Sequence, residues 1–271
     1  MAGQKHDLDE KDMDTSDVSP FMPMFQGFRD ELDQHQERRE RIIKASRDIT
    51  ALSKKIIFSL QRVRHLQQPI PPPIAKETNT RYKSIQELFT TIAPDLQGIN
   101  SWRYQKQISG GCQEFVEAIS FQHYLETQRL LTHAEAQALI PGGVELTTDD
   151  YVLGLFDLTG ELMRFGITNI ATNGTLPRGT PAGEGSEGRD ILMDLRAIRT
   201  HFESLDTSSG PNDFSYLKKD IQKKTEVMRE SVGKVEYAAY GMIIRGRERP
   251  KGWVPDLNEG QDRGREPVES Y

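Results

Sequence analysis

A long stretch without helix-breaking residues is the feature that most constrains the fold. Between Phe28 and Gln68 the sequence contains neither glycine nor proline. Its apolar residues recur at steps of three, four or seven, which places them on one face of an α-helix. These residues are Ile42, Ile49, Leu52, Ile56, Leu60 and Val63. The pattern predicts an amphipathic helix over residues 21–68 that ends before Pro69, because proline cannot continue a helix.

The rest of the chain also follows helical spacing. Further helices are expected over residues 76–92, 101–131, 133–139, 149–171, 190–206 and 213–245. The segment 149–171 is apolar nearly all round, which is typical of a central, buried helix. The Gly110-Gly111 pair is tolerable inside a helix if another backbone packs closely there. Since no alternating strand pattern and no internal repeat is visible, we predict an all-α fold, an antiparallel bundle of about six or seven helices.

The sequence divides into one expected domain and segments of different composition. Residues 21–245 form the predicted single all-α domain. Residues 1–20 are acidic and almost free of apolar side chains, and residues 246–271 are charged and rich in proline and glycine. Both are therefore expected to be flexible tails. Residues 172–190 contain five glycines and two prolines, which predicts a flexible surface loop within the domain.

Composition excludes several classes of protein. The single cysteine, Cys112, excludes a disulfide framework and a Cys-rich zinc site, and its place on an apolar helix face favours a packing role. No apolar run approaches the roughly 20 residues of a membrane span, and the N-terminus lacks the apolar core of a signal peptide. We expect an intracellular protein. The sequence also lacks a P-loop, the G-x-S-x-G and H-E-x-x-H motifs, and Glu-x-x-His.

The net charge of −6 hides one strongly basic segment. Residues 38–64 hold nine Lys and Arg against only Glu40 and Asp48. Such asymmetry is the first indication of an anionic partner, although a solvated helix face would have the same composition.

Two pairs of acids lie in the helices expected to be most buried. Glu114 and Glu117 are three residues apart, and Asp157 and Glu161 are four apart. Each pair therefore lies on one helix face, with neighbouring Cβ atoms about 5–6 Å apart. If the two helices pack face to face, four carboxyl groups converge, and they need a countercharge. An all-oxygen ligand set suits Mg²⁺, with Mn²⁺ or Ca²⁺ as alternatives.

A carboxylate-held Mg²⁺ can activate water and offset charge on a phosphate group during its transfer. The alternative is a structural one, in which Glu161 pairs with Arg164 while Glu114 and Glu117 face solvent. Acid pairs at this spacing are common on exposed helices, so spacing alone leaves both interpretations open.

Four segments of the sequence resemble the translin-associated factor X (TRAX) proteins of the translin family. They are Gly111–Tyr124, Asp150–Arg164, Ser46–Thr50 with Ser53-Lys54-Lys55, and Lys234–Ala238 with Arg245-Gly246. The similarity runs in order over residues 25–250. It implies an all-α subunit that assembles with translin into a closed, hollow hetero-oligomer, expected to be an octamer.

The resemblance also implies an activity. TRAX subunits carry a Mg²⁺-dependent endoribonuclease centre, whose acids fall on Glu114, Glu117, Asp157 and Glu161 in this sequence. Family roles include removal of small-RNA passenger strands and trimming of transfer-RNA fragments. The chain is therefore expected to cut single-stranded RNA with these four residues as catalytic and metal-binding groups, using Mg²⁺ or Mn²⁺.

The residues that contact RNA are less constrained by the pattern. Arg47 and Lys54 of the basic segment are candidates for lining the RNA path, Tyr104 for stacking on a base, and His123 for assisting the substrate. The rival hypothesis is a non-catalytic subunit that binds RNA and stabilises translin. The expected compartment is the cytoplasm, with the nucleus as an alternative.

Overall fold

A computed structural model of the chain describes residues 19–180, 188–205 and 215–245. These residues form eight α-helices and one 3-10 helix, and their only β pairing is an isolated antiparallel bridge between Arg178 and Asp190. The all-α prediction is therefore confirmed. The predicted acidic tail up to residue 18, the C-terminal tail and the centre of the 172–190 loop lie outside the described residues.

The chain separates into two compact units, residues 1–40 and residues 41–271. In the first unit, the described residues form the beginning of helix α1 (Met22–Leu60), and most of their side chains are exposed. The remainder of α1 belongs to the second unit, together with every other helix. The candidate site lies entirely in the second unit.

The other elements of the second unit follow in chain order. They are α2 (Pro72–Ile92), η2 (Ala93–Leu96), α3 (Ile99–Arg103), α4 (Gln105–Thr127), α5 (His133–Ala138), α6 (Thr148–Asn173), α7 (Ile191–Glu203) and α8 (Ser215–Arg245). Among the described residues, no helix is both long enough and apolar enough to cross a membrane.

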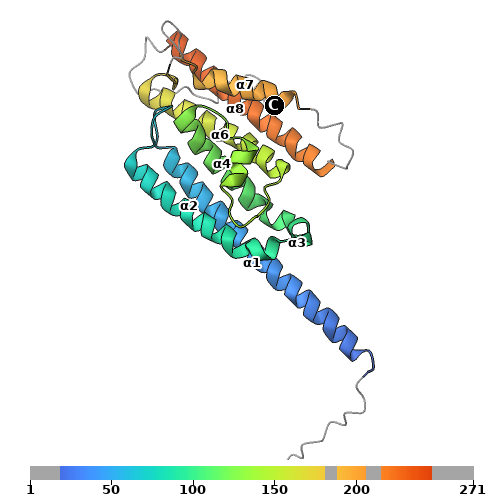
Figure 1. The fold of residues 1–271 in the computed structure, drawn as a ribbon. Coiled ribbons are helices and arrows are strands. Elements are labelled where there is room, and N and C mark those ends of the chain that lie inside the picture. Colours follow the sequence, from blue (N-terminus) through green and yellow to red (C-terminus); the bar gives the residue numbers. More distant parts are fainter. Residues whose placement is uncertain (1–18, 181–187, 206–214, 246–271) are drawn as a thin grey trace, which may run out of the picture. The chain divides into compact units, whose positions relative to one another are not determined.

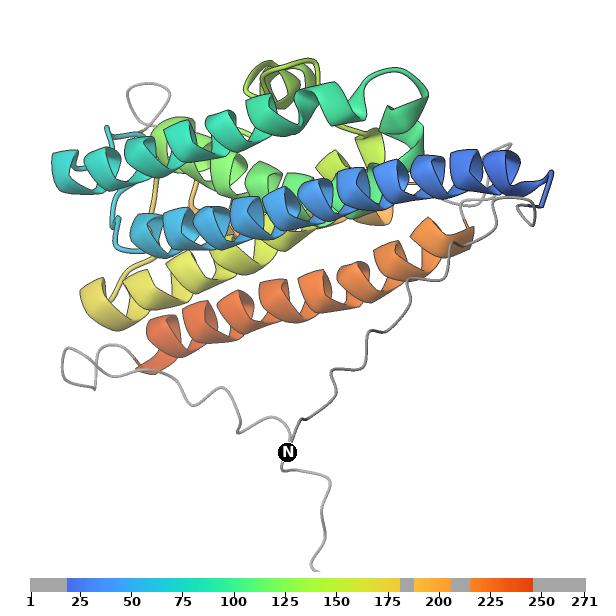
Figure 2. The same ribbon diagram turned by 90° about the horizontal axis from the view of Figure 1, so that it is seen from below.

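The helices of the second unit are arranged in layers (Figure 1). Its portion of α1 lies beside α2, α4 and α6 form the middle, and α7 and α8 pack together on the other side. Figure 2 shows α6 and α8 side by side along most of their length. The middle position of α6 agrees with its nearly continuous apolar sequence.

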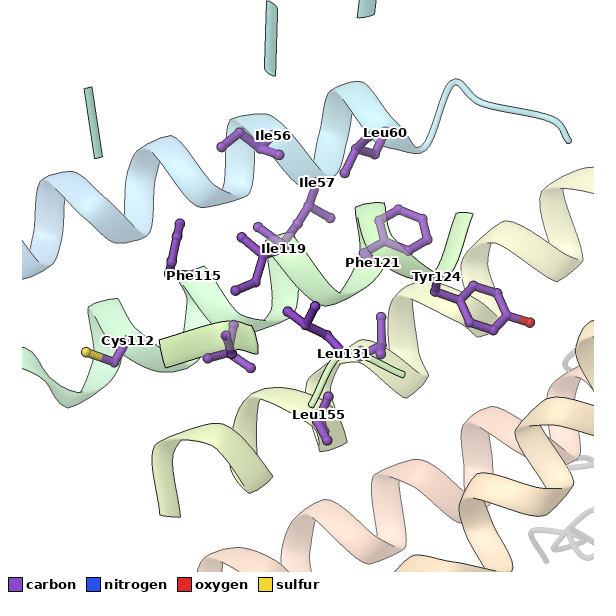
Figure 3. Close-up of a cluster of buried hydrophobic side chains, with 14 of the residues drawn as sticks. Ile56, Ile57, Leu60, Cys112, Phe115, Ile119, Phe121, Tyr124, Leu131 and Leu155 are labelled. Atoms are coloured by element: carbon purple, nitrogen blue, oxygen red, sulfur yellow. The ribbon is translucent and has the colours of Figure 1, made fainter. Parts of the chain in front are cut away.

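Apolar side chains from α1, α4 and α6 fill the space between the layers (Figure 3). Ile56 and Leu60 of α1 and Phe115 of α4 are at most 1% exposed. Cys112 lies in the same cluster with no exposed surface, so its predicted packing role is confirmed. Burial also raises the pKa of its thiol, which keeps the sulfur protonated and unreactive.

Two glycines let the central helices approach closely. A Cβ atom at Gly111 would lie 3.0 Å from Ser46 Oγ and 3.1 Å from the Ser46 carbonyl oxygen, so α1 and α4 pack backbone to backbone here. A Cβ atom at Gly154 of α6 would lie 2.7 Å from the backbone oxygen of Gln113 in α4. The predicted close approach is confirmed at Gly111, whereas a Cβ at Gly110 would meet nothing within 4 Å.

Several helix boundaries differ from those expected; α2, for example, begins at Pro72 rather than at residue 76. Helix α1 ends at Leu60 instead of Gln68, because Val63 and Leu66 turn into the core and are at most 5% exposed. The turn is closed by the Arg64 guanidinium, which donates to the backbone oxygens of the residues around it. Tertiary burial therefore outweighs the local helical pattern.

The predicted helix over 101–131 is interrupted and shorter. It divides at Tyr104, whose backbone leaves the helical region (φ −107°, ψ 13°) and whose ring is buried. It ends at Gln128, which adopts a left-handed conformation with φ 55°. Thr132 and Thr147 cap the next two helices, since the side chain of each accepts a hydrogen bond from the backbone N–H three residues on.

The close contact of α4 and α6 predicts opposite effects for two Gly→Ala substitutions. Gly154→Ala should lower the free energy of unfolding by about 1–3 kcal/mol, because the new methyl group collides with the α4 backbone. Gly110→Ala should raise it by about 1 kcal/mol through helix propensity alone. Denaturant unfolding of both variants measures this, and equal effects would contradict the close packing.

Candidate functional site

The four acids singled out by their spacing lie around one space between α4 and α6. Glu114 and Glu117 extend from α4, and Asp157 and Glu161 from α6. Apart from burial, the other three carboxylates each raise the pKa of Glu117, which shows that the two pairs converge. The close approach at Gly154 brings the helices near enough for this convergence.

Glu117 is the innermost of the four acids. It is 8% exposed, and the described residues offer its carboxyl group no hydrogen bond or ion pair. Burial, followed by the charge of the neighbouring acids, raises its pKa from 4.5 to about 9. A buried carboxyl group without a partner is rare in proteins, and it marks the place where a positive charge is missing.

The other three acids each face a basic side chain. Lys224 Nζ of α8 lies 2.5 Å from both carboxylate oxygens of Asp157. Lys54 Nζ of α1 lies 3.7 Å from Glu114 Oε2. These two cations offset part of the mutual repulsion of the carboxylates.

Glu161 has two partners. Gln61 Nε2, in the turn after α1, donates to its Oε2 at 2.6 Å, and Arg164 lies 3.5 Å from its Oε1. The ion pair with Arg164 agrees with the structural alternative raised above. That alternative also places Glu117 in solvent, and the structure contradicts this part because the Glu117 side chain is buried.

Three of the acids line an open pocket of about 510 Å³ whose walls are largely basic. The lining residues are Lys54, Lys55, Ile57, Phe58, Arg81, Glu114, Glu117, Glu161 and Arg164. The acids belong to α4 and α6, and the remaining side chains come from α1, α2 and, three residues after Glu161, from Arg164 of α6. Carboxylates and cations on one surface can bind a metal ion and an anionic substrate together.

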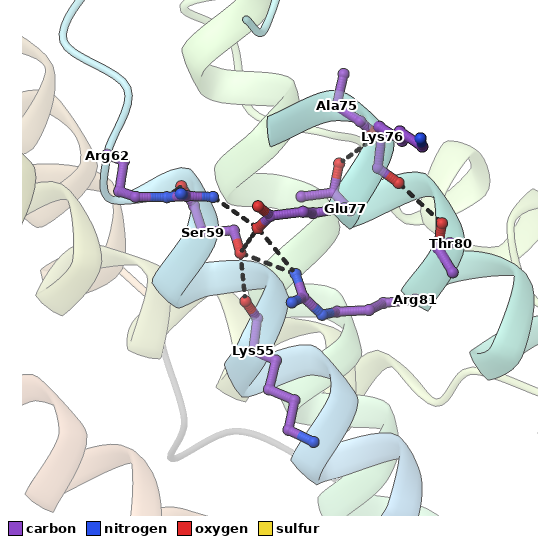
Figure 4. A network of polar contacts seen from close by, with 9 residues as sticks. Lys55, Ser59, Arg62, Ala75, Lys76, Glu77, Thr80 and Arg81 are labelled. Carbon is purple, nitrogen blue, oxygen red and sulfur yellow. Dashed lines mark hydrogen bonds and ion pairs between the residues drawn. The ribbon is translucent and has the colours of Figure 1, made fainter. Parts of the chain in front are cut away.

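A polar network fixes one wall of the pocket (Figure 4). Glu77 of α2 accepts hydrogen bonds from Ser59 Oγ at 3.0 Å and from Arg62 at 2.6 Å. Arg81 Nη1 donates to Ser59 Oγ at 2.8 Å and lies 3.7 Å from Glu77. The Ser59 hydrogen bond, with the two arginines, lowers the pKa of Glu77, so this acid stays ionised and holds Arg81 in place.

The donor set fits a hard divalent cation. Four carboxyl groups supply only oxygen ligands, and the charge of Lys224 offsets only part of the rise in the pKa of Glu117. In the described part of the chain, no three Asp, Glu, His or Cys side chains are arranged as a ready coordination shell. Asp157 and Glu114 are instead engaged in ion pairs, with Lys224 and Lys54 respectively.

The structure separates the four RNA contacts expected from sequence. Lys54 lines the acidic pocket, and Arg47 is exposed on the same helix but outside the pocket. His123 lines a different cavity, of about 290 Å³, on the Tyr82 side of α4. Tyr104 is 4% exposed, so its ring has no free face, and the predicted stacking role is wrong for this conformation.

Sequence reasoning missed several residues that line the pocket or contact its acids and Asp157. Phe58 and Gln61 follow Lys54 at steps of four and three, so helical spacing alone places them on its face. Lys224 and Arg81 carry no such signal, because they reach the site from other helices.

The fold and the pocket define a class of protein: a helical bundle with a pocket lined by acids and cations. Residues 37–246 match the translin family, and the chain belongs to this family. It is 30% identical to translin-associated protein X of Rattus norvegicus over 276 residues, which cover 93% of this chain and 88% of that protein. It is 26% identical to translin of Mus musculus over 239 residues, covering 84% and 94%.

A solved structure shares the fold at lower identity. The structure of AfC3PO in complex with duplex RNA superposes with a TM-score of 0.57 and 17% identity, covering 83% of this chain and all of that one. The bundle architecture is therefore the same in both.

Replacing Glu117 tests whether its pKa is raised in the folded protein. The raised pKa means that the folded state keeps a proton that the unfolded state releases above about pH 4.5, so stability from this group falls as pH rises toward 9. In chelator, Glu117→Gln should therefore raise the free energy of unfolding little at pH 5 and by about 1 kcal/mol or more at pH 8.5. Denaturant unfolding at both pH values measures this. The exposed Glu126→Gln in the same helix is the control, and an effect independent of pH would contradict the assignment.

The ion pair on Asp157 gives a second stability test. Lys224→Met should lower the free energy of unfolding in chelator by about 1 kcal/mol, because it leaves Asp157 facing three other acids without a cation. The adjacent Lys223→Met removes an equal charge from an exposed position and should have almost no effect. Thermal unfolding compares the two, and identical midpoints would mean that the pair does not stabilise the site.

Proposed function

We propose that this chain is the RNA-cleaving subunit of a complex with translin, a metal-dependent endoribonuclease that acts on single-stranded RNA. The broader part, a role with translin and RNA, is supported by membership of the translin family and by the similarity to translin-associated protein X. It is supported further by the shared fold with AfC3PO, which was solved with duplex RNA.

One observation carries the catalytic part of the proposal. Glu117 is buried among three other acids and forms no hydrogen bond or ion pair with the described residues, in a pocket that four basic side chains also line. A protein that only bound RNA would have no use for this arrangement, because four acids repel phosphate. A cation site beside a phosphate site explains both charges.

The residues divide the chemistry between them. Glu114, Glu117, Asp157 and Glu161 would hold Mg²⁺ or Mn²⁺. When bound, such an ion lowers the pKa of water and offsets charge on a phosphodiester. Gln61 orients the Glu161 carboxylate through its 2.6 Å hydrogen bond. Lys55 and Arg81 offer positive charge to the RNA backbone at the pocket wall.

Cleavage of a labelled single-stranded RNA by this chain, co-expressed with translin, tests the proposal. We expect cutting in Mg²⁺, none in chelator, and at least about a 100-fold loss for Asp157→Asn and for Glu117→Gln, since each removes a charged ligand. Light scattering checks that the variants still assemble, and Glu126→Gln serves as the control. RNA binding without cutting in every sample would instead make this a non-catalytic binding subunit.

A further inference from the structure

Phe58 is an unusually placed aromatic residue. Its ring is 75% exposed, although it belongs to α1, whose neighbouring Ile57 and Ser59 are buried. It lines the acidic pocket together with Lys55 and Arg81. Single exposed apolar residues are common, so the position of Phe58 beside these charges, rather than its exposure, is informative.

The cations around Phe58 are held to different degrees. Lys54 and Arg164 face acids of the pocket floor, and Arg81 is fixed by Glu77. Lys55, adjacent to Lys54, has no acidic partner among the described residues. Phe58 therefore lines a pocket that contains both the acids and Lys55, a cation that no described acid neutralises.

We propose that Phe58 is a base-stacking platform, on which one unpaired nucleobase of the RNA lies while Lys55 and Arg81 hold an adjacent phosphate. This inference rests on the proposed function and adds to it the residue that positions the substrate. Aromatic side chains interleaved with cations are how proteins bind single strands without sequence preference.

A protein partner fits this place less well. The centre of a protein interface is depleted in charged residues, whereas Phe58 shares its pocket with Lys54, Lys55 and Arg81. The exposed apolar residues near the end of α8, such as Ile243 and Ile244, are adjacent to one another and suit a protein surface better.

The platform also sets the form of the substrate. Bases inside a continuous A-form helix stack on both faces, so none is free to lie on Phe58. Single strands, nicks and frayed ends supply such a base. The preference for single-stranded over duplex RNA would then come from Phe58, separately from any cleavage at the four acids.

Binding measurements test the platform directly. The complex with translin is titrated into a fluorescent single-stranded RNA in chelator, and fluorescence anisotropy gives Kd. We expect Phe58→Ala to weaken binding about 5- to 100-fold and Phe58→Trp to remain within about twofold of wild type. Trp102→Ala is the matched control, because Trp102 is 82% exposed but lines none of the described pockets.

A series of RNAs with a single abasic position identifies the stacked base. At one position, loss of the base should lower the affinity of the wild-type complex. The same abasic RNA and the intact RNA should bind the Phe58→Ala complex with equal affinity. Additive losses at every position would overturn the proposal. An unchanged affinity of the Phe58→Ala complex for intact RNA would also overturn it. A Phe58→Ala complex of altered mass would overturn it too, because it would place the ring in a subunit interface.

Parallel cleavage assays in Mg²⁺ separate this inference from the proposed function. If wild type cuts RNA but Phe58→Ala binds and cuts normally, the platform is wrong and the nuclease proposal stands. If wild type binds with the Phe58-dependent abasic pattern but never cuts, the platform stands and the nuclease proposal is wrong.

Discussion

Repulsion among four buried or partly buried carboxyl groups is the constraint on which the site depends. Between α4 and α6 these groups lie close enough for each to raise the pKa of Glu117. Ionising all of them requires cations at short range. Lys224, Lys54 and Arg164 supply three such charges from three different helices, and Glu117 is left without one. Among the described residues the site thus holds one more carboxyl group than paired cations, and the raised pKa of Glu117 keeps a proton on that group.

Backbone packing is what forces the acids together. Gly154 lets α6 approach α4 at the level of Gln113, next to the first acid of α4. On the other side, Gly111 lets α1 approach α4, which brings Lys54 and Phe58 to the edge of the same space. A larger residue at either glycine would separate the helices. The electrostatics of the site therefore depend on two contacts that contain no charge.

Helical spacing predicts the parts of the site that belong to one helix. It placed Glu114 with Glu117 and Asp157 with Glu161, and the apolar pattern indicated that both helices would be central. It could not predict Lys224, whose contact with Asp157 joins residues 67 positions apart. Helical spacing also predicted that α1 would continue beyond Leu60, because a local pattern contains no information about the burial of Val63 and Leu66 in the core.

The balance of charge distinguishes a cutting subunit from a binding one. With three cations on four acids, the floor of the pocket keeps a small negative charge whenever Glu117 is ionised, and an RNA phosphate is repelled from it. On the proposed function, RNA would then be held only at the wall, by Lys55 and Arg81. A bound divalent cation would reverse the sign of the floor and let a phosphate approach the acids. Under that proposal the same residues would support binding alone or binding with cleavage, and the occupancy of the acidic floor would decide between them.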